Sequence, residues 1–272
     1  MGKAWLIASG KGGVGKSTLS AGLGTALAKT GHSVCIIDGD IGLRDQDAIL
    51  GVQDRVIYDL VDVANKDCRL QQALISPSGM PGIELLPASQ FARSKELDPR
   101  AFGRIVTELK GNHDDVIIDC PAGIERGFRG LLKSDIDACI LVCTPDDVCM
   151  RNAERASALI DKKGLPRAQV IVNRLIPGLI AQGEMYNAMT VAQTLDLPLL
   201  GEVPDDPNVY RSLLGHIPLV NVDCEARNAI WRIAQRMTGE NVPLPAYGSE
   251  KPTWFQRLFR KKQMKEVKRL DC

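Results

Sequence analysis

Short apolar runs recur along the chain, and stretches with helical periodicity separate them. The runs are mostly continuous and seldom alternate with polar residues, which is typical of strands covered on both faces of a parallel sheet. The predicted strands are Ala4–Ala8, Val34–Asp38, Ile83–Pro87, Val116–Asp119, Ala138–Cys143, Gln169–Val172 and Leu199–Val203. The predicted helices are Lys16–Lys29, Pro99–Lys110, Arg151–Lys163, Met185–Leu195 and Glu225–Thr238. This alternation predicts an α/β fold, a doubly wound, mostly parallel sheet with helices on both faces.

The chain is predicted to form one domain with an appended tail. No repeat, low-complexity tract or linker appears before about residue 240, so residues 1–240 are expected to fold together. Residues 241–253 contain three prolines and a glycine, which predicts a non-helical tether. Residues 254–272 follow as a basic tail.

Composition and charge narrow the class of protein. A hydrophobic content of 44% and a charged content of 25% are those of an ordinary globular protein. The eight cysteines form no C-x-x-C pair, and the start of the chain is a predicted strand with no signal peptide, so we expect reduced thiols in a cytoplasmic protein. Residues 251–272 carry eight Lys or Arg against two acidic residues, and the rest of the chain has a net charge of −5. This distribution of charge predicts an anionic partner for the tail and not for the rest of the chain.

A glycine-rich loop between the first predicted strand and the first predicted helix indicates a nucleotide site. Gly10 to Ser17 matches the pattern G-x-x-x-x-G-K-[ST], in the strand–loop–helix context that this pattern requires. Glycines let backbone N–H groups close around phosphate oxygens, and the start of the helix presents the positive end of its dipole. Lys16 would reach the β- and γ-phosphates, and the Ser17 hydroxyl would bind Mg²⁺. The predicted ATP-binding residues of the loop are Gly10, Lys11, Gly12, Gly13, Val14, Gly15, Lys16, Ser17 and Thr18.

Other classes of site receive less support. The three histidines are scattered, which disfavours a metal site built on them. The sequence lacks the G-x-S-x-G elbow of a hydrolase nucleophile around Ser9 or Ser17. The loop also lacks the G-x-G-x-x-G spacing of dinucleotide-binding oxidoreductases.

Lys11 distinguishes this loop from a general phosphate loop. The string from Lys11 to Thr18, Lys-Gly-Gly-Val-Gly-Lys-Ser-Thr, resembles the deviant Walker A motif of the ParA/MinD family of ATPases. The resemblance implies an ATP-bound homodimer in which Lys11 reaches the phosphates of the partner subunit. Hydrolysis would then require dimerisation, because charge that stabilises the transition state arrives in trans.

Three further stretches resemble the same family in the same order along the chain. Asp40 follows the second predicted strand, and the resemblance assigns it the positioning or deprotonation of the attacking water. Asp119 ends the fourth strand, where it would hold the Mg²⁺ shell, and Pro-Ala-Gly after it would sense the γ-phosphate. Residues after two late strands would contact the adenine, namely Asn173, Arg174, Pro204 and Asp205. Lys11, Lys16 and Asp40 are thus the predicted catalytic residues, and Ser17 and Asp119 the predicted metal ligands.

Longer strings resemble the MinD branch of this family, the septum-site-determining ATPases, more than the plasmid-partition branch. Among them are Asp40-Ile-Gly-Leu-Arg44 and Leu86-Pro-Ala-Ser-Gln90. The resemblance implies recruitment of a MinC-like septum inhibitor and an activator or topological factor, MinE-like or other. Two segments differ from the usual pattern. Asp45-Gln46 stands where Asn-Leu is common, and Cys149-Met-Arg-Asn152 stands where Ser-x-Arg-Asp is associated with partner binding.

The basic tail has the pattern of a short interfacial helix. Its apolar side chains fall within an arc of about 140° at 100° per residue. The predicted membrane contacts are Trp254, Phe255, Leu258 and Phe259, with Arg257, Arg260 and Lys261 beside or opposite them. A stretch this short cannot span a bilayer, which takes roughly 20 residues, but it can lie among anionic headgroups. The alternatives are a disordered basic segment or a segment that binds nucleic acid.

The resemblance, together with the pattern of the tail, implies an ATP-dependent switch of bacterial division-site placement. It would be cytoplasmic, and peripheral on the inner face of the cell membrane when ATP is bound; no nucleic-acid partner is expected. A flagellar-placement ATPase and a ParA-like DNA-segregation ATPase are alternatives within the same fold. A biosynthetic ATP-dependent ligase is a third alternative, although no predicted acceptor site supports it.

Overall fold

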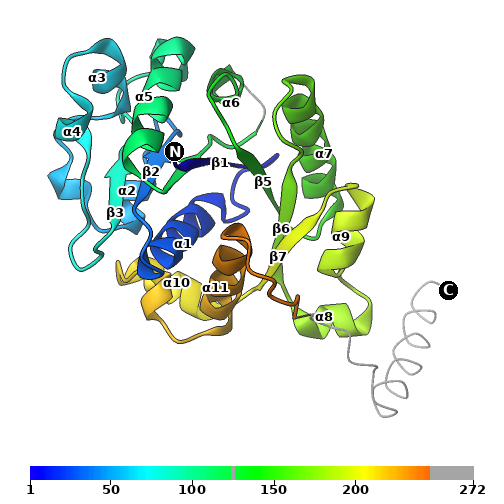
Figure 1. The fold of residues 1–272 in the computed structure, drawn as a ribbon. Helices are drawn as coiled ribbons and strands as arrows, with labels where there is room; N and C mark the ends of the chain where they lie inside the picture. Colours follow the sequence, from blue (N-terminus) through cyan, green and yellow to red (C-terminus); the bar gives the residue numbers. More distant parts are fainter. Residues whose placement is uncertain (124–125, 246–272) are drawn as a thin grey trace.

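A computed structural model describes residues 1–123 and 126–245. It contains one seven-stranded sheet with helices on both faces (Figure 1). The strands are β1 (Lys3–Ala8), β2 (Val34–Asp38), β3 (Ile83–Leu86), β4 (Asp115–Asp119), β5 (Ala138–Cys143), β6 (Gln169–Leu175) and β7 (Leu199–Pro204). All pairings between these strands are parallel. The predicted fold class is confirmed, and each predicted strand lies within three residues of its observed bounds.

Helices connect the strands on both faces. They are α1 (Lys16–Lys29), α2 (Gln46–Ile49), α3 (Leu60–Asn65), α4 (Leu70–Ala73), α5 (Pro99–Asn112), α6 (Arg126–Leu131), α7 (Asp147–Lys162), α8 (Pro177–Gln182), α9 (Ala188–Thr194), α10 (Pro207–Leu214) and α11 (Glu225–Met237). The short helices α2, α3, α4, α6, α8 and α10 were not predicted, because four to eight residues show little 3.6-residue periodicity. Short 3₁₀ turns occur at Gln53–Arg55, Ser94–Glu96 and Leu219–Asn221.

Capping side chains explain where two helices begin. α7 was expected from Arg151 but begins at Asp147, because the Asp146 side chain accepts a hydrogen bond from the Cys149 backbone N–H at 2.9 Å. α9 begins at Ala188, three residues after the predicted start. There the Asn187 side chain accepts a hydrogen bond from the Thr190 backbone N–H at 2.8 Å.

The strand order β3-β2-β4-β1-β5-β6-β7 places the middle of the sheet at β1. From β1 the chain crosses to β2 on one side, and it later returns through β4 to β5 on the other side. Connections that cross the sheet in opposite directions therefore lie on opposite faces: α1 and α11 cover one face, and α5, α7 and α9 cover the other (Figure 1). In such sheets ligands bind outside the carboxyl ends of the strands, at the point where the order reverses. That edge is called the carboxyl edge below.

Helix α1 packs tightly between the sheet and α11. A Cβ atom on Gly22 would lie 2.8 Å from Ile230 Cδ1, and one on Gly24 would lie 2.8 Å from Ile36 Cδ1. Small residues on α1 thus let it approach both neighbours closely. This packing fixes the first turn of α1, which follows the glycine-rich loop.

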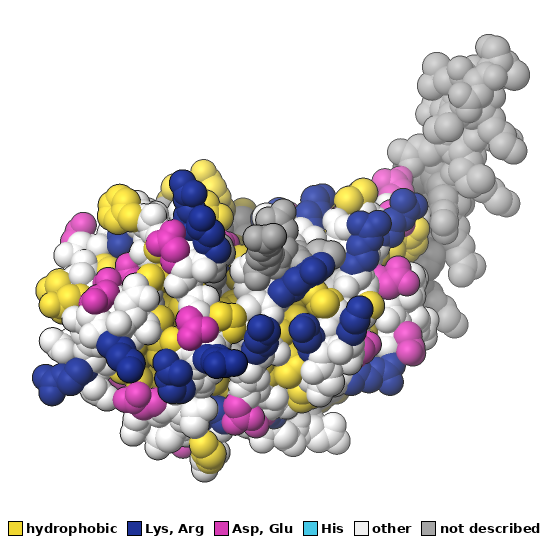
Figure 2. Space-filling model, turned by 90° about the horizontal axis from the view of Figure 1, so that it is seen from above, with side chains coloured by type: hydrophobic (Ala, Val, Ile, Leu, Met, Phe, Trp, Pro, Cys, Tyr) yellow, Lys and Arg dark blue, Asp and Glu magenta, His cyan; other side chains and the backbone are white. Residues whose placement is uncertain are grey.

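The exposed sides of α5, α6 and α7 are polar and carry charges of both signs (Figure 2). This is the expected outer face of amphipathic helices that pack on a sheet. Within residues 1–123 and 126–245, no helix is both long and apolar enough to cross a membrane. Most of the predicted tether and the whole basic tail, including Trp254 to Lys261, lie outside the described residues.

Candidate nucleotide site

The glycine-rich loop lies at the carboxyl edge between β1 and α1 and requires glycine at several positions. Gly13 and Gly15 have φ angles of +77° and +90°, and Gly15 is the residue immediately before α1. A Cβ atom on Gly15 would lie 2.4 Å from the Asn173 side-chain nitrogen. A Cβ atom on Gly10 would lie 2.2 Å from the carbonyl carbon of Asn152 in α7. The loop can therefore approach both β6 and α7 only without side chains there.

Lys16 and Asp119 form a buried ion pair behind the loop. Lys16 Nζ lies 2.7 Å from Asp119 Oδ1, and both side chains are at least nine-tenths buried. Burial lowers the pKa of the Lys16 ammonium, but the charge of Asp119 and its hydrogen bond outweigh burial, so the net pKa shift is upward. Ser20 Oγ also donates to Asp119 Oδ1 at 2.9 Å. The Ser17 hydroxyl lies beside the pair, 3.4 Å from Lys16 Nζ.

Two polar residues that the sequence analysis did not assign to the nucleotide site complete this cluster. Asp38 ends β2 in register with Asp119 at the end of β4, and both are fully buried. Burial, with the nearby charge of Asp119, raises the pKa of Asp38 to about 7. Gln46 Nε2 donates to Asp119 Oδ2 at 2.8 Å and to the backbone carbonyl of Ser17 at 3.0 Å. Gln46 lies in a segment with no strand or helix periodicity, so its position could not be predicted.

Asp40 lies two residues beyond β2, half-buried, with its backbone N–H donating to Asp38 Oδ1 at 3.0 Å. Burial raises the pKa of its carboxyl group, while the charge of Lys16 and a hydrogen bond from the Ala122 backbone N–H lower it; the net shift is upward. A half-buried carboxyl group with a raised pKa can orient a water molecule and accept its proton.

The predicted adenine contacts lie together around one hollow beside the loop. β6 shifts register against β7 between Val172 and Leu175, and Arg174 has a φ of +59°. This irregularity directs Asn173 to the glycine loop, where its Nδ2 donates to the Val14 carbonyl at 2.8 Å. The hollow is lined by Gly15, Thr18, Asn173, Arg174, Pro204 and Asp205, together with apolar side chains and Tyr210. Tyr210, from α10, was missed because it lies in a helix too short to predict.

Comparisons with known proteins agree with this geometry. Residues 5–219 match the family described as the CobQ/CobB/MinD/ParA nucleotide binding domain. The septum site-determining protein MinD of Bacillus subtilis is 41% identical over 248 residues, which cover 90% of this chain and 92% of that protein. MinD of Helicobacter pylori is 40% identical over 244 residues, which cover 87% of this chain and 90% of that protein. The chain belongs to the MinD family of septum site-determining proteins.

Solved structures agree with membership of the MinD family. A MinC:MinD cell division protein complex from Aquifex aeolicus matches with a TM-score of 0.84 at 35% identity, covering 90% of this chain and 99% of that chain. MinD complexed with Mg-ADP from Pyrococcus horikoshii matches with a TM-score of 0.78 at 29% identity, covering 87% of this chain and 96% of that chain. The predicted family is confirmed. This MinD-family chain is an ATPase of division-site placement that uses ATP and Mg²⁺, and the flagellar, partition and ligase alternatives are not favoured.

Lys11 lies at the surface, as expected for a lysine that would reach the phosphates of a second subunit. Its side chain is exposed, and no hydrogen bond or ion pair to it occurs within the described part of the chain. Its charge reaches Asp146 at the start of α7. Burial there raises the pKa of Asp146, but hydrogen bonds from Thr144 and Cys149 and the charge of Lys11 together lower it. Lys11 is therefore free to approach a second molecule.

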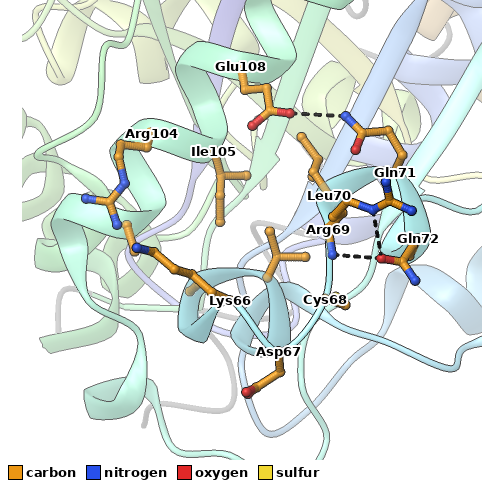
Figure 3. A pocket seen from close by; sticks show the side chains of 13 residues that line it. Lys66, Asp67, Cys68, Arg69, Leu70, Gln71, Gln72, Arg104, Ile105 and Glu108 are labelled. Atoms are coloured by element: carbon orange, nitrogen blue, oxygen red, sulfur yellow. Dashed lines mark hydrogen bonds between the residues drawn. The ribbon is translucent and has the colours of Figure 1, made fainter.

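A separate hollow between α3, α4 and α5 contains none of the predicted site residues (Figure 3). Several of its polar side chains bond one another: Gln71 donates to Glu108 at 3.1 Å, and Arg69 donates to Gln72 at 3.3 Å. The carboxyl edge, in contrast, brings together every predicted phosphate, metal and adenine residue of this MinD-family chain. The roles of the individual residues remain predictions.

Proposed function

We propose that this chain is an ATP-dependent, dimerising membrane switch of division-site placement. Two ATP-bound copies would form a homodimer, bind the inner face of the cell membrane through residues 254–272 and recruit a MinC-like septum inhibitor. Hydrolysis, stimulated by a MinE-like or other activator, would return them to the cytoplasm. The observation that carries the proposal is Lys11, an exposed cation within a phosphate loop whose ammonium group forms no hydrogen bond or ion pair with the described residues.

The residues at the carboxyl edge fit ATP and Mg²⁺. Beyond its chain neighbours, a Cβ atom on Gly13 would meet no atom of the described residues within 4 Å, which supports open space for phosphate beside the loop. The Ser17 hydroxyl and the Asp119 carboxylate supply the oxygen ligands that Mg²⁺ prefers, directly or through water. When bound, Mg²⁺ neutralises charge on the phosphate oxygens.

The other roles in binding and hydrolysis are proposed for side chains of the protein itself. Lys16 would leave Asp119 for the β- and γ-phosphate oxygens, and Asp119 would then hold the water shell of the metal. Asp40 would orient the attacking water and accept its proton, as its raised pKa favours. Lys11 of the partner subunit would stabilise charge on the transferred phosphoryl group, a contribution of about 10³–10⁵ in rate for comparable cations supplied in trans.

The partner surface is proposed to include the start of α7. The Aquifex aeolicus relative is described as a MinC:MinD complex, which supports a MinC-like partner here. Arg151 and Asn152 lie in the first turns of α7, where Asn152 adjoins Gly10 of the phosphate loop. A partner bound there would sense the nucleotide directly. Asp45 and Asn152 depart from the usual family pattern, so the partner's contacting residues are expected to differ correspondingly.

Membrane binding is proposed to depend on dimerisation. Each basic side chain near an anionic leaflet contributes roughly 1 kcal/mol, so one short tail binds weakly. Two tails on one dimer bind with a high effective concentration and much greater avidity. ATP would thereby control membrane attachment without any change in the tail itself.

Liposome co-sedimentation tests the switch. The full chain and a chain ending at Gly248 are mixed with anionic vesicles in ATP or in ADP. We expect the full chain to pellet with vesicles in ATP, and the other three samples to remain largely in solution. Lys16→Ala is the control for nucleotide dependence and should not pellet in ATP. Equal pelleting in all four samples, or ATP-dependent pelleting of Lys16→Ala, would contradict the proposal.

A further inference from the structure

Gln46 joins three elements at the carboxyl edge. It is the first residue of α2 and is fully buried. Its backbone N–H donates to Asp38 Oδ2 at 3.0 Å, at the end of β2. Its side-chain nitrogen donates to Asp119 Oδ2 at 2.8 Å, at the end of β4, and to the Ser17 carbonyl at 3.0 Å, in the first turn of α1. One side chain thus contacts both predicted metal-binding residues.

The orientation of the Gln46 amide is fixed by its partners. A carboxylate oxygen and a backbone carbonyl oxygen both require a donor, so the amide nitrogen must face them. The other amide atom, Oε1, is buried and has no hydrogen-bond partner among the described residues. From the amide geometry, Oε1 lies at most about 5 Å from Asp119 Oδ2. A buried acceptor left without a donor destabilises the protein.

Asp119 depends on Gln46 for one of its two oxygens. Oδ1 accepts hydrogen bonds from Lys16 and Ser20, whereas Gln46 is the partner of Oδ2 within the described residues. When Lys16 moves to the phosphates, Gln46 and Ser20 remain to hold the carboxylate. Because α2 follows Asp40 in the chain, Gln46 also ties the Asp40 loop to the metal-binding residues.

We propose that Gln46 is a positioning residue of the magnesium site. It orients Asp119 through Oδ2, and once Lys16 has moved to the phosphates its Oε1 would accept a hydrogen bond from a water molecule of the Mg²⁺ shell. That water would supply the donor that the buried Oε1 lacks among the described residues. This inference rests on the proposed binding of ATP with Mg²⁺ and adds to it a residue that the phosphate-loop motif does not contain.

A purely structural role for Gln46 predicts a different outcome. If Gln46 only fastened α2 to α1 and β4, its loss would lower the stability of the nucleotide-free protein and leave the Mg²⁺ requirement unchanged. As a positioning residue, it should raise the Mg²⁺ requirement. Loss of the amide also leaves the buried Asp119 Oδ2 without its hydrogen bond, so stability should fall under either role, and the Mg²⁺ titration is the measurement that separates them.

The test measures binding of a fluorescent, non-hydrolysable ATP analogue as Mg²⁺ is titrated, and again in EDTA. The variants are Gln46→Leu and Gln46→Met, of which the second keeps the length of the side chain and loses the amide. We expect the Mg²⁺ concentration for half-maximal enhancement to rise about tenfold in both variants, as for residues that orient metal ligands. Affinity in EDTA should stay within about twofold of wild type.

Gln53→Leu is the matched control, because Gln53 also has a buried, unpartnered Oε1 but belongs to a 3₁₀ turn outside the site. It should leave the Mg²⁺ titration unchanged. An unchanged titration in both Gln46 variants would overturn the inference and leave the proposed function intact. Absence of Mg²⁺-dependent binding in the wild-type chain would instead contradict the proposed function, and the inference with it.

Discussion

At the scale of single residues, the carboxyl edge concentrates acidic groups that the fold removes from water. Asp38 and Asp119 end neighbouring strands in register and are both fully buried. Only one cation, Lys16, pairs directly with them in the described structure, and it bonds Asp119. Asp38 instead accepts hydrogen bonds from the backbone N–H groups of Asp40 and Gln46. Burial disfavours the charged form and, with the charge of Asp119, raises the pKa of Asp38 by more than these hydrogen bonds lower it.

The raised pKa of Asp38 makes the free energy of unfolding depend on pH, and the sign of this dependence follows from the direction of the shift. The pKa of Asp38 is about 7 in the folded protein against an ordinary value of 3.8 for an aspartate, so between those values the folded state binds more protons than the unfolded state. The free energy of unfolding should therefore fall as pH rises from about 4 to about 7, by at most about 1.4 kcal/mol per pH unit from this group. Asp38→Asn should flatten the slope. Urea unfolding in EDTA without nucleotide measures it, and parallel pH profiles for the two proteins would refute this assignment.

The sequence predicts the positions of those site residues that a local motif fixes, and it does not predict those that a long-range contact fixes. Lys16 and Ser17 follow from the loop motif, because the spacing within a strand–loop–helix unit fixes their positions. Asp119 follows from its place at the end of an apolar strand. Gln46 and the protonation of Asp38 depend on β4 lying beside β2, a long-range pairing that no local pattern specifies.

At the scale of elements, continuous apolar runs and long amphipathic patterns identify the strands and longer helices. The sheet order is not contained in those patterns, because every central strand is similarly apolar. Helix α3 illustrates a different difficulty. It has six residues and is recognisable mainly by a capping box between Asp59 and Asp62, a signal that periodicity does not capture.

Two glycine-to-alanine substitutions in the glycine-rich loop test whether the loop needs glycine where it joins α1. Gly15→Ala places a Cβ atom 2.4 Å from the Asn173 side chain at a φ of +90°, so we expect a loss of about 1–3 kcal/mol in unfolding free energy. Gly12→Ala meets only Ala122 Cβ at 3.7 Å, an ordinary contact, and should change stability little. Denaturant unfolding without nucleotide distinguishes them. Equal stabilities would mean that the loop accommodates a side chain at Gly15 by moving.

At the scale of the whole molecule, the proposed function implies that the site is incomplete in one copy. Asp40, Lys16 and Asp119 lie together, whereas Lys11 of the same chain is exposed and bonds none of them. A face-to-face homodimer would supply the missing cation to each site symmetrically, because a two-fold interface places the same residue on both sides. Under the proposed function, dimerisation is therefore a catalytic requirement as well as the source of membrane avidity.

Mixing two inactive variants tests this requirement directly. Lys11→Ala retains Asp40, and Asp40→Ala retains Lys11, so each homodimer lacks one component at both sites. A hybrid dimer restores one complete site, formed by the Lys11→Ala subunit with Lys11 from its partner. Random pairing makes about half of the dimers hybrid, each with one working site of two, so ATPase activity should recover to about a quarter of wild type. Substantial activity in Lys11→Ala alone, or no recovery on mixing although hybrid dimers form, would exclude action in trans.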